Sequence, residues 1–271
     1  MSNIKMIAVD LDDTLLRTDL SISWRTRRTI RSAQKAGIVV VIASGRVLNA
    51  MLQYIKQLNM QKYGSYIICG NGTTIHEAKN LTIIEQITIP DKIALAAFDL
   101  ANAEGFAVQL YRNNKIYVSR SNEFSELDYK LTGIADVVSP DFRDMVADNT
   151  DKLVIPGDPM LLRPLETLMR NMLGETATLF TSKPYYLEVL PPKTDKGSAL
   201  KKIAGMLGIE RENVMAFGDS MNDEAMLRWA GWSVAMVNGD ERVRNVAKCI
   251  SDFSNDDDGV AKMIEKYALK A

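Results

Sequence analysis

The sequence predicts an α/β fold: a doubly wound, Rossmann-like parallel sheet with an inserted α+β domain. Three apolar segments in the first third of the chain, 4–9, 38–43 and 66–69, each stop abruptly at polar or glycine residues. Nearly continuous apolar strands of this kind are typical of a parallel sheet that is covered on both faces. A fourth such segment, 213–217, lies far along the chain and predicts that the same sheet is completed there.

Helix signals follow these strands, as a doubly wound sheet requires. Ser23 is a candidate N-cap for a helix that runs to about Ala36 and is closed by Gly37. Other helices are predicted up to about Leu58 and over about 195–207. The first helix carries several arginines, which we interpret as a solvated face in preference to an anion site: Arg25, Arg27, Arg28 and Arg31.

The pattern changes from about Ile83. Alternating apolar and polar residues there predict antiparallel strands with one solvated face, at 83–89, 106–111, 115–118 and 185–190. Helical patterns lie between these segments, at about 91–104, 123–131 and 159–172. We therefore predict an inserted domain over 83–190, between two parts of a core domain, 1–82 and 191–271.

Composition indicates a globular protein that binds neither nucleic acid nor a membrane. The 271 residues suffice for two domains, and a net charge of −1 without a basic stripe argues against nucleic acid. No stretch approaches the roughly 18 apolar residues that span a bilayer. Because the N-terminus enters the first strand without a signal-peptide core, we expect a cytoplasmic protein. Cys69 and Cys249 lie far apart in the sequence and form no metal-ligand pattern, so we expect both to be reduced thiols. The expected assembly is a monomer or a weak homodimer.

Carboxylates stand where two of the predicted strands end. Asp10 and Asp12 directly follow the first strand, and Asp219 and Asp223 follow the fourth. Buried carboxylates are costly unless cations pair with them, and hard cations such as Mg²⁺ prefer oxygen ligands. Because ligands of open α/β sheets collect at the carboxyl ends of the strands, a metal site is predicted there. The alternative is that these residues only cap turns and helices.

Two further segments supply groups that suit a phosphate. Ser44 and Gly45 follow the second strand, where a hydroxyl and free backbone N–H groups at a helix start can bind an anionic oxygen. Lys196 begins a helix after the insert and offers a cation. Carboxylates, a divalent cation, a lysine and an anion-binding nest are the parts that phosphoryl transfer needs. Taken singly, each group also has a plain structural role as a cap or a surface charge.

Four motifs in this order resemble those of the haloacid dehalogenase-like phosphatases: Asp-Leu-Asp-Asp-Thr at 10–14, Ser-Gly-Arg at 44–46, Lys-Gly at 196–197 and Gly-Asp-Ser-Met-Asn-Asp at 218–223. The insert lies between the second and third motifs, as the large α/β cap (type C2) does in the Cof-type sugar-phosphatase branch. The resemblance spans nearly the whole chain. It implies a catalytic core and a cap that covers the site and sets substrate specificity.

The resemblance also implies a role for each matching residue. Asp10 would be the nucleophile that forms an aspartyl-phosphate, and Asp12 the general acid and base. Mg²⁺ would be held by the Asp10 carboxylate, the Asp12 backbone carbonyl and Asp219, with Asp223 supporting it directly or through water. Other groups would surround the phosphate: the Leu11 N–H, Ser44, the Gly45 N–H, Lys196 and Asn222. Asn71 and Gly72 resemble a turn that lies near the site in this family.

Two positions depart from the family pattern. Asp13 stands where a glycine is frequent, although aspartate also occurs there in this branch. The approach to the third motif, 191–196, matches only loosely, so that Lys193 competes with Lys196 as the phosphate-binding lysine.

The expected function is a Mg²⁺-dependent phosphatase of small phosphorylated metabolites, such as sugar phosphates. The alternatives are a phosphomutase of sugar phosphates and a signalling module that is phosphorylated on Asp10 without turnover. His76 is the only histidine, which excludes a Ser–His–Asp triad and a histidine-rich zinc site. We expect His76 on a surface turn.

Overall fold

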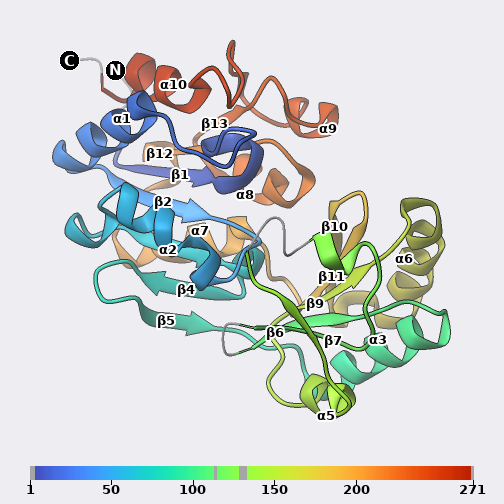
Figure 1. Ribbon diagram of the computed structural model, residues 1–271. Helices are drawn as coiled ribbons and strands as arrows, with labels where there is room; N and C mark the ends of the chain where they lie inside the picture. The colour runs from blue at the N-terminus through green and yellow to red at the C-terminus, as the bar shows by residue number, and fades with distance from the viewer. Residues whose placement is uncertain (1–3, 113–114, 128–132, 270–271) are drawn as a thin grey trace. The chain divides into compact units, whose positions relative to one another are not determined.

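The computed structural model describes residues 4–112, 115–127 and 133–269. By its internal contacts the chain divides into two compact units (Figure 1). The first unit consists of Met1–Glu85 and Asp195–Ala271, and the second of Gln86–Thr194. The sequence predicts boundaries a few residues away, with a core of 1–82 and 191–271 around an insert of 83–190. The assignment of the units as catalytic core and cap stays a prediction.

An eight-stranded sheet forms the centre of the first unit, in the order β14-β13-β12-β1-β2-β3-β4-β5. Neighbours from β14 to β3 are parallel, and β4 is antiparallel to β3. The bounds are β1 Met6–Asp10, β2 Val39–Ala43, β3 Tyr66–Cys69, β4 Thr74–Glu77, β5 Thr82–Gln86, β12 Val214–Gly218, β13 Trp232–Ala235 and β14 Cys249–Ile250. The predicted fold class, with all four expected strands, is confirmed.

Helices cover both faces of this sheet (Figure 1). Because side chains along a strand alternate in direction, Ile7 and Val9 of β1 pack into one core and Met6 and Ala8 into another. The first core includes residues of α1 (Trp24–Lys35), α2 (Leu48–Gln57) and α10 (Gly259–Tyr267). The second includes residues of α7 (Lys196–Met206), α8 (Glu224–Trp229) and α9 (Glu241–Arg244). Burial on both faces explains the continuous apolar sequence of these strands.

The helix predicted after Ser23 is present, and its start follows from a local hydrogen bond. The Ser23 Oγ accepts from the Thr26 backbone N–H at 3.0 Å, as an N-cap side chain does. Gly37 follows the helix with a φ of 84°, which a glycine adopts without steric cost.

His76 is not on a surface turn, and this prediction is wrong. It lies on β4, opposite Ile67 of β3, and is 6% exposed. The reason is the turn at 70–72, in which Gly70, Asn71 and Gly72 all have positive φ. That turn reverses the chain at once and pairs β4 with β3. Strand β5, at the edge of the same sheet, similarly places the start of the alternating segment from Ile83 in the first unit.

The second unit is a six-stranded sheet in the order β10-β11-β9-β6-β7-β8. Its bounds are β6 Gln109–Arg112, β7 Lys115–Val118, β8 Asp136–Val138, β9 Leu153–Pro156, β10 Thr178–Lys183 and β11 Tyr186–Leu190. Three helices share one core with the sheet: α3 (Asp91–Ala103), α5 (Phe142–Val146) and α6 (Pro159–Leu173). The helix predicted over 123–131 falls partly outside the described residues.

Among the helices of the described residues, none has the length and apolar character needed to cross a membrane.

Candidate active site

The predicted site residues of the first unit gather around the carboxyl end of β1. This strand lies between β2 and β12, so that the next strands of the chain, β2 and β3, are added on one side of it and the last strands, β12 to β14, on the other. Such a switch in strand order opens a crevice at the carboxyl ends, where ligands bind in α/β sheets. Asp10 is the last residue of β1, Ser44 follows β2, and Asp219 follows β12.

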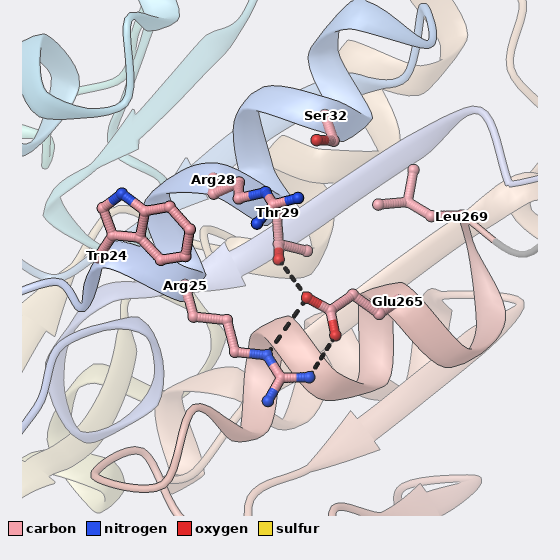
Figure 2. Close-up of a pocket in the computed structure, with 7 residues that line it drawn as sticks. All are labelled: Trp24, Arg25, Arg28, Thr29, Ser32, Glu265 and Leu269. Atoms are coloured by element: carbon pink, nitrogen blue, oxygen red, sulfur yellow. Dashed lines mark hydrogen bonds and ion pairs between the residues drawn. The ribbon is translucent and has the colours of Figure 1, made fainter.

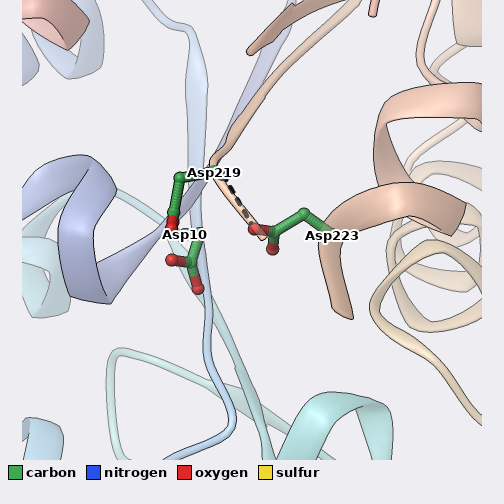
Figure 3. A group of neighbouring side chains, drawn as sticks. All are labelled: Asp10, Asp219 and Asp223. Carbon is green, nitrogen blue, oxygen red and sulfur yellow. Dashed lines mark hydrogen bonds between the residues drawn. The ribbon is translucent and has the colours of Figure 1, made fainter. Parts of the chain in front are cut away.

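Three of the predicted carboxylates form one buried cluster. Asp10, Asp219 and Asp223 each place a carboxylate oxygen within 4.8 Å of the other two (Figure 3). All three residues are buried. Like charges this close, and removed from water, disfavour the ionised form of one another.

Burial is the main cause of the altered acidity in this cluster. It raises the pKa of Asp10 well above its usual range, and the neighbouring charge of Asp223 adds to the effect. Burial and Asp223 likewise raise the pKa of Asp219, to about 7. Both shifts therefore have the same two causes, removal of the carboxylate from water and the neighbouring negative charge of Asp223.

Lys196 is the cation that the structure places in the cluster. Its Nζ donates to Asp10 Oδ1 at 2.5 Å and to Asp223 Oδ1 at 2.6 Å, and the residue is 0% exposed. Burial alone lowers the pKa of a lysine, but Asp10 and Asp223 outweigh it and raise the pKa of Lys196. Lys193, the rival for this role, is exposed and lies in the second unit.

One lysine against three ionised carboxylates leaves two negative charges unmatched. A divalent cation would balance them, and the donors are hard oxygens of the kind that Mg²⁺ binds. The residues present therefore fit a magnesium ion.

The start of α7 fixes Lys196. The Asp195 Oδ1 accepts from the Ser198 backbone N–H at 2.7 Å and caps the helix. Gly197 packs closely against the backbone of α8. A Cβ at this position would lie 2.5 Å from the Ala225 carbonyl carbon, which is too close for a side chain. A glycine beside the lysine is therefore required by the close approach of these two segments.

Backbone and hydroxyl donors hold the carboxylates that follow β12. Asp223 Oδ2 accepts from the backbone N–H groups of Asp219 and Ser220, at 3.0 and 3.1 Å. The Thr14 Oγ1 donates to Asp219 Oδ1 at 2.8 Å. These bonds fix both side chains while leaving other oxygen lone pairs for further ligands.

Asp12 is not part of the carboxylate cluster that the structure forms. Its carboxylate is bound by the guanidinium of Arg46 through two hydrogen bonds. The preceding Leu11 has its side chain fully buried in the first core. The following Asp13 has a φ of 57°, a left-handed conformation that glycine and, less readily, aspartate adopt.

The turn at 70–72 joins the second and fourth motifs. The Asn222 Nδ2 donates to Asn71 Oδ1 at 3.0 Å. A Cβ on Gly45 would lie 2.9 Å from the Asn71 Nδ2, so a side chain there would displace this amide. Ser44 does not cap the helix that follows it, because the residue before α2 is Val47. The Ser44 Oγ instead accepts from the Arg46 backbone N–H at 3.1 Å.

The sequence predicts no role for Arg46 or Thr14. Arg46 lies in the Ser-Gly-Arg motif and Thr14 in the Asp-Leu-Asp-Asp-Thr motif, and this position inside a motif is the one sign in the sequence that either residue belongs to the site. Their partners lie 34 and 205 residues away in the sequence, so that only the fold shows what each side chain contacts.

A separate cavity of about 470 Å³ lies between α1 and α10 (Figure 2). The Arg25 guanidinium there binds Glu265 with two hydrogen bonds, and Arg28 lies 5.2 Å from the centre of the Trp24 ring. Trp24 is 67% exposed and is not a packing residue of the core. None of the predicted site residues lines this cavity.

Comparison with known proteins agrees with the motifs. The model of the haloacid dehalogenase-like hydrolase family matches residues 7–264. A 5-amino-6-(5-phospho-D-ribitylamino)uracil phosphatase of Bacillus subtilis is 32% identical over 268 residues, covering 98% of this chain and 97% of the relative. An HMP-PP phosphatase of Cronobacter sakazakii is 29% identical over 240 residues, covering 85% and 83%. A crystal structure of a haloacid dehalogenase-like hydrolase from Bacteroides thetaiotaomicron superposes with a TM-score of 0.88 at 31% identity, covering 97% of this chain and 99% of the other. The family match spans both units, which confirms the resemblance drawn from the four motifs: the chain belongs to the haloacid dehalogenase-like hydrolase family and is an enzyme.

Proposed function

We propose that this enzyme is a Mg²⁺-dependent phosphatase that hydrolyses small phosphorylated metabolites through an aspartyl-phosphate on Asp10. The observation that carries the proposal is the buried contact of Lys196 with Asp10 and Asp223 beside Asp219. A structural ion pair would need one carboxylate for one lysine. Three carboxylates and a lysine at the carboxyl end of β1 instead match what phosphoryl transfer requires.

In the first step, an Asp10 carboxylate oxygen attacks the phosphorus and the bond to the leaving oxygen breaks. Asp12 gives its proton to that oxygen, so that the product leaves as an alcohol. In the second step, Asp12 takes a proton from water as the water oxygen attacks the phosphorus. The bond from phosphorus to Asp10 then breaks, and inorganic phosphate is released with Asp10 as carboxylate.

Other residues of the site hold the phosphate. Lys196 supplies positive charge, and the Ser44 hydroxyl can still donate its own hydrogen while its oxygen accepts from the Arg46 N–H. The remaining donors are the backbone N–H groups of Leu11 and Gly45 and the side chain of Asn222. The bond from Asn222 to Asn71 supports this assignment because it orients the amide.

The metal would be held by the Asp10 carboxylate, the Asp12 backbone carbonyl and Asp219, with Asp223 directly or through water. When bound, it offsets the repulsion between an anionic nucleophile and an anionic phosphate. Asp223 already accepts three hydrogen bonds, from Lys196 and from two backbone N–H groups, which favours its role through water.

The substrate class is proposed from the relatives. The Bacillus subtilis relative is named for a phosphorylated ribityl compound and the Cronobacter sakazakii relative for HMP-PP. Sugar phosphates and phosphorylated sugar alcohols are accordingly the first substrates to test, and the second unit is the part in which we expect their specificity to be determined.

The test is release of inorganic phosphate from p-nitrophenyl phosphate and a panel of sugar phosphates, with Mg²⁺, with EDTA, and with the Asp10→Asn variant. We expect metal-dependent turnover that falls at least about a thousandfold in Asp10→Asn, because the amide is a poor nucleophile. Turnover that survives both EDTA and Asp10→Asn would refute the mechanism. A stable phosphorylated Asp10 without turnover, or isomerisation of the sugar phosphate without phosphate release, would identify the signalling module or the phosphomutase instead.

A further inference from the structure

Arg46 binds the carboxylate of Asp12 with two parallel hydrogen bonds. Its Nε donates to Asp12 Oδ2 at 2.9 Å and its Nη2 donates to Asp12 Oδ1 at 2.5 Å. A bidentate pair of this kind fixes the plane of a carboxylate as well as its position, because the guanidinium is itself planar.

The rest of the structure holds Arg46 in place independently of Asp12. Its backbone N–H donates to the Ser44 Oγ at 3.1 Å, and its carbonyl accepts from the Gly70 N–H at 3.1 Å. The guanidinium also lies 5.8 Å from the centre of the Tyr54 ring, on the helix that follows. These contacts position Arg46 without Asp12, and the Asp12 carboxylate binds to the guanidinium that they position.

The pair combines a buried cation with a partly exposed carboxylate. The Arg46 side chain is 6% exposed and that of Asp12 25%. Burial acts to lower the pKa of Arg46, but the hydrogen bonds to Asp12 outweigh it and raise the pKa. Each carboxylate oxygen keeps a further lone pair, so that Asp12 can still carry or accept a proton on the exposed side.

We propose that Arg46 is a positioning residue that aligns Asp12 for both of its proton transfers. The inference rests on the proposed function. Arg46 exchanges no proton itself, and the contact proposed for it is with the Asp12 carboxylate and not with the phosphate, the leaving oxygen or the water. Asp12 protonates the leaving oxygen as its bond to phosphorus breaks, and later deprotonates the attacking water.

This role predicts a dependence on the leaving group. A sugar alkoxide is a strong base and leaves only with a proton, whereas p-nitrophenolate is a weak base and leaves without one. Loss of Arg46 should therefore slow formation of the aspartyl-phosphate far more with a sugar phosphate than with p-nitrophenyl phosphate. The second step uses the same water with both substrates and should slow equally.

The experiment compares wild type with Arg46→Gln and Arg46→Lys, using p-nitrophenyl phosphate and the sugar phosphate that wild type hydrolyses fastest. General acid catalysis contributes about 10²–10⁴-fold, so we expect the first-turnover rate of Arg46→Gln with the sugar phosphate to fall about ten- to a hundredfold. The fall with p-nitrophenyl phosphate should be at least about tenfold smaller, and a burst of nitrophenol should precede slow steady turnover. Arg46→Lys, which keeps the charge but not the bidentate geometry, should recover part of the loss.

Arg25→Gln is the matched control, because it removes a bidentate arginine–carboxylate pair of the same unit, between α1 and α10. It should keep the wild-type rates with both substrates. The inhibition constant for inorganic phosphate should change less than about twofold in Arg46→Gln, since the proposed contact is with Asp12 and not with phosphate.

Equal losses with both substrates in the first turnover would overturn the inference. So would a large loss of inorganic phosphate binding, which would make Arg46 a phosphate ligand. A stability cycle tests the Arg46–Asp12 pair itself, whether or not wild type is active: the urea midpoint should shift less in the Asp12→Asn, Arg46→Gln double variant than the sum of the two single shifts. Additive shifts would mean that the pair does not exist in solution. A wild type without turnover would refute the proposed function, and with it the role of Arg46, while leaving the pair itself testable.

Discussion

Lys196 is the residue on which the buried carboxylates depend for charge balance. Replacing it by methionine keeps much of the volume but leaves Asp10 and Asp223 without their cation. Breaking a buried pair from one side costs about 3–5 kcal/mol, and we expect a loss of this order in the free energy of unfolding at pH 8 without Mg²⁺, measured by urea denaturation.

The matched control is Lys202→Met on the same helix. Lys202 pairs with Glu85, but its side chain is 46% exposed. Exposed pairs contribute about 0–1 kcal/mol, so this variant should remain close to wild type. Equal losses of unfolding free energy in the two variants would show that the buried contacts of Lys196 stabilise the protein no more than the exposed pair of Lys202 does.

The raised pKa of Asp219, about 7, predicts how stability depends on pH. The unfolded value is about 3.9, so the metal-free folded state holds its proton more tightly than the unfolded state between these values. The stability from this group is fully present below about pH 4 and is lost as pH rises through about 7.

Mg²⁺ should act in the opposite direction, because it binds the ionised carboxylates. We therefore expect the increase in melting temperature caused by Mg²⁺ to be small at pH 5.5 and large at pH 8, by differential scanning fluorimetry. Asp219→Asn should flatten this dependence. An increase that is the same at both pH values would contradict a site built from Asp10 and Asp219.

Among the secondary-structure elements, α7 allows a comparison of two glycines in one helix. A Cβ on Gly197 would meet the backbone of Ala225 at 2.5 Å, whereas one on Gly205 would meet nothing within 4 Å. Gly197→Ala should destabilise the protein by about 1–3 kcal/mol, because backbone must move to relieve the contact. Gly205→Ala should stabilise it by about 0.5–1 kcal/mol, since alanine loses less entropy in a helix.

Thermal unfolding of the two variants measures both effects. Gly197→Ala should also lower turnover, because α7 carries Lys196 and any shift of the helix start moves its amine. A Gly197→Ala variant as stable as wild type would mean that α7 and α8 are farther apart than the structure has them.

For the molecule as a whole, the division into two units predicts separable folding. The second unit is one continuous stretch, Gln86–Thr194, with a core of its own formed by α3, α5, α6 and the six-stranded sheet. We expect a fragment of residues 86–194 to give a single cooperative urea transition by circular dichroism. Leu187→Asp, which puts a charge at a fully buried position of β11, should abolish that transition. A fragment without any transition would show that the unit needs the rest of the chain.

Local patterns were sufficient for much of the fold. The Ser23 cap, the continuous apolar strands and the closing glycine after α1 each depend on neighbours in sequence, and each is present. The buried position of His76 was not predictable, because it depends on β4 reversing onto β3 through three successive positive φ angles. A short segment with one polar residue does not indicate which strand it will pair with, or whether that residue will be buried.

The sequence by itself determined the family, the doubly wound sheet and the residues that carry its motifs, since each motif directly follows a strand or begins a helix. Only the tertiary structure decided which of those residues touch. Lys196 reaches Asp10 across 186 positions and Asp12 reaches Arg46 across 34, while Lys193, three residues before Lys196, is exposed. The physical reason is that contacts between distant segments depend on the order of the strands in the sheet and on how closely two backbone segments approach. Both are properties of the whole fold, and no short segment of the sequence determines either of them.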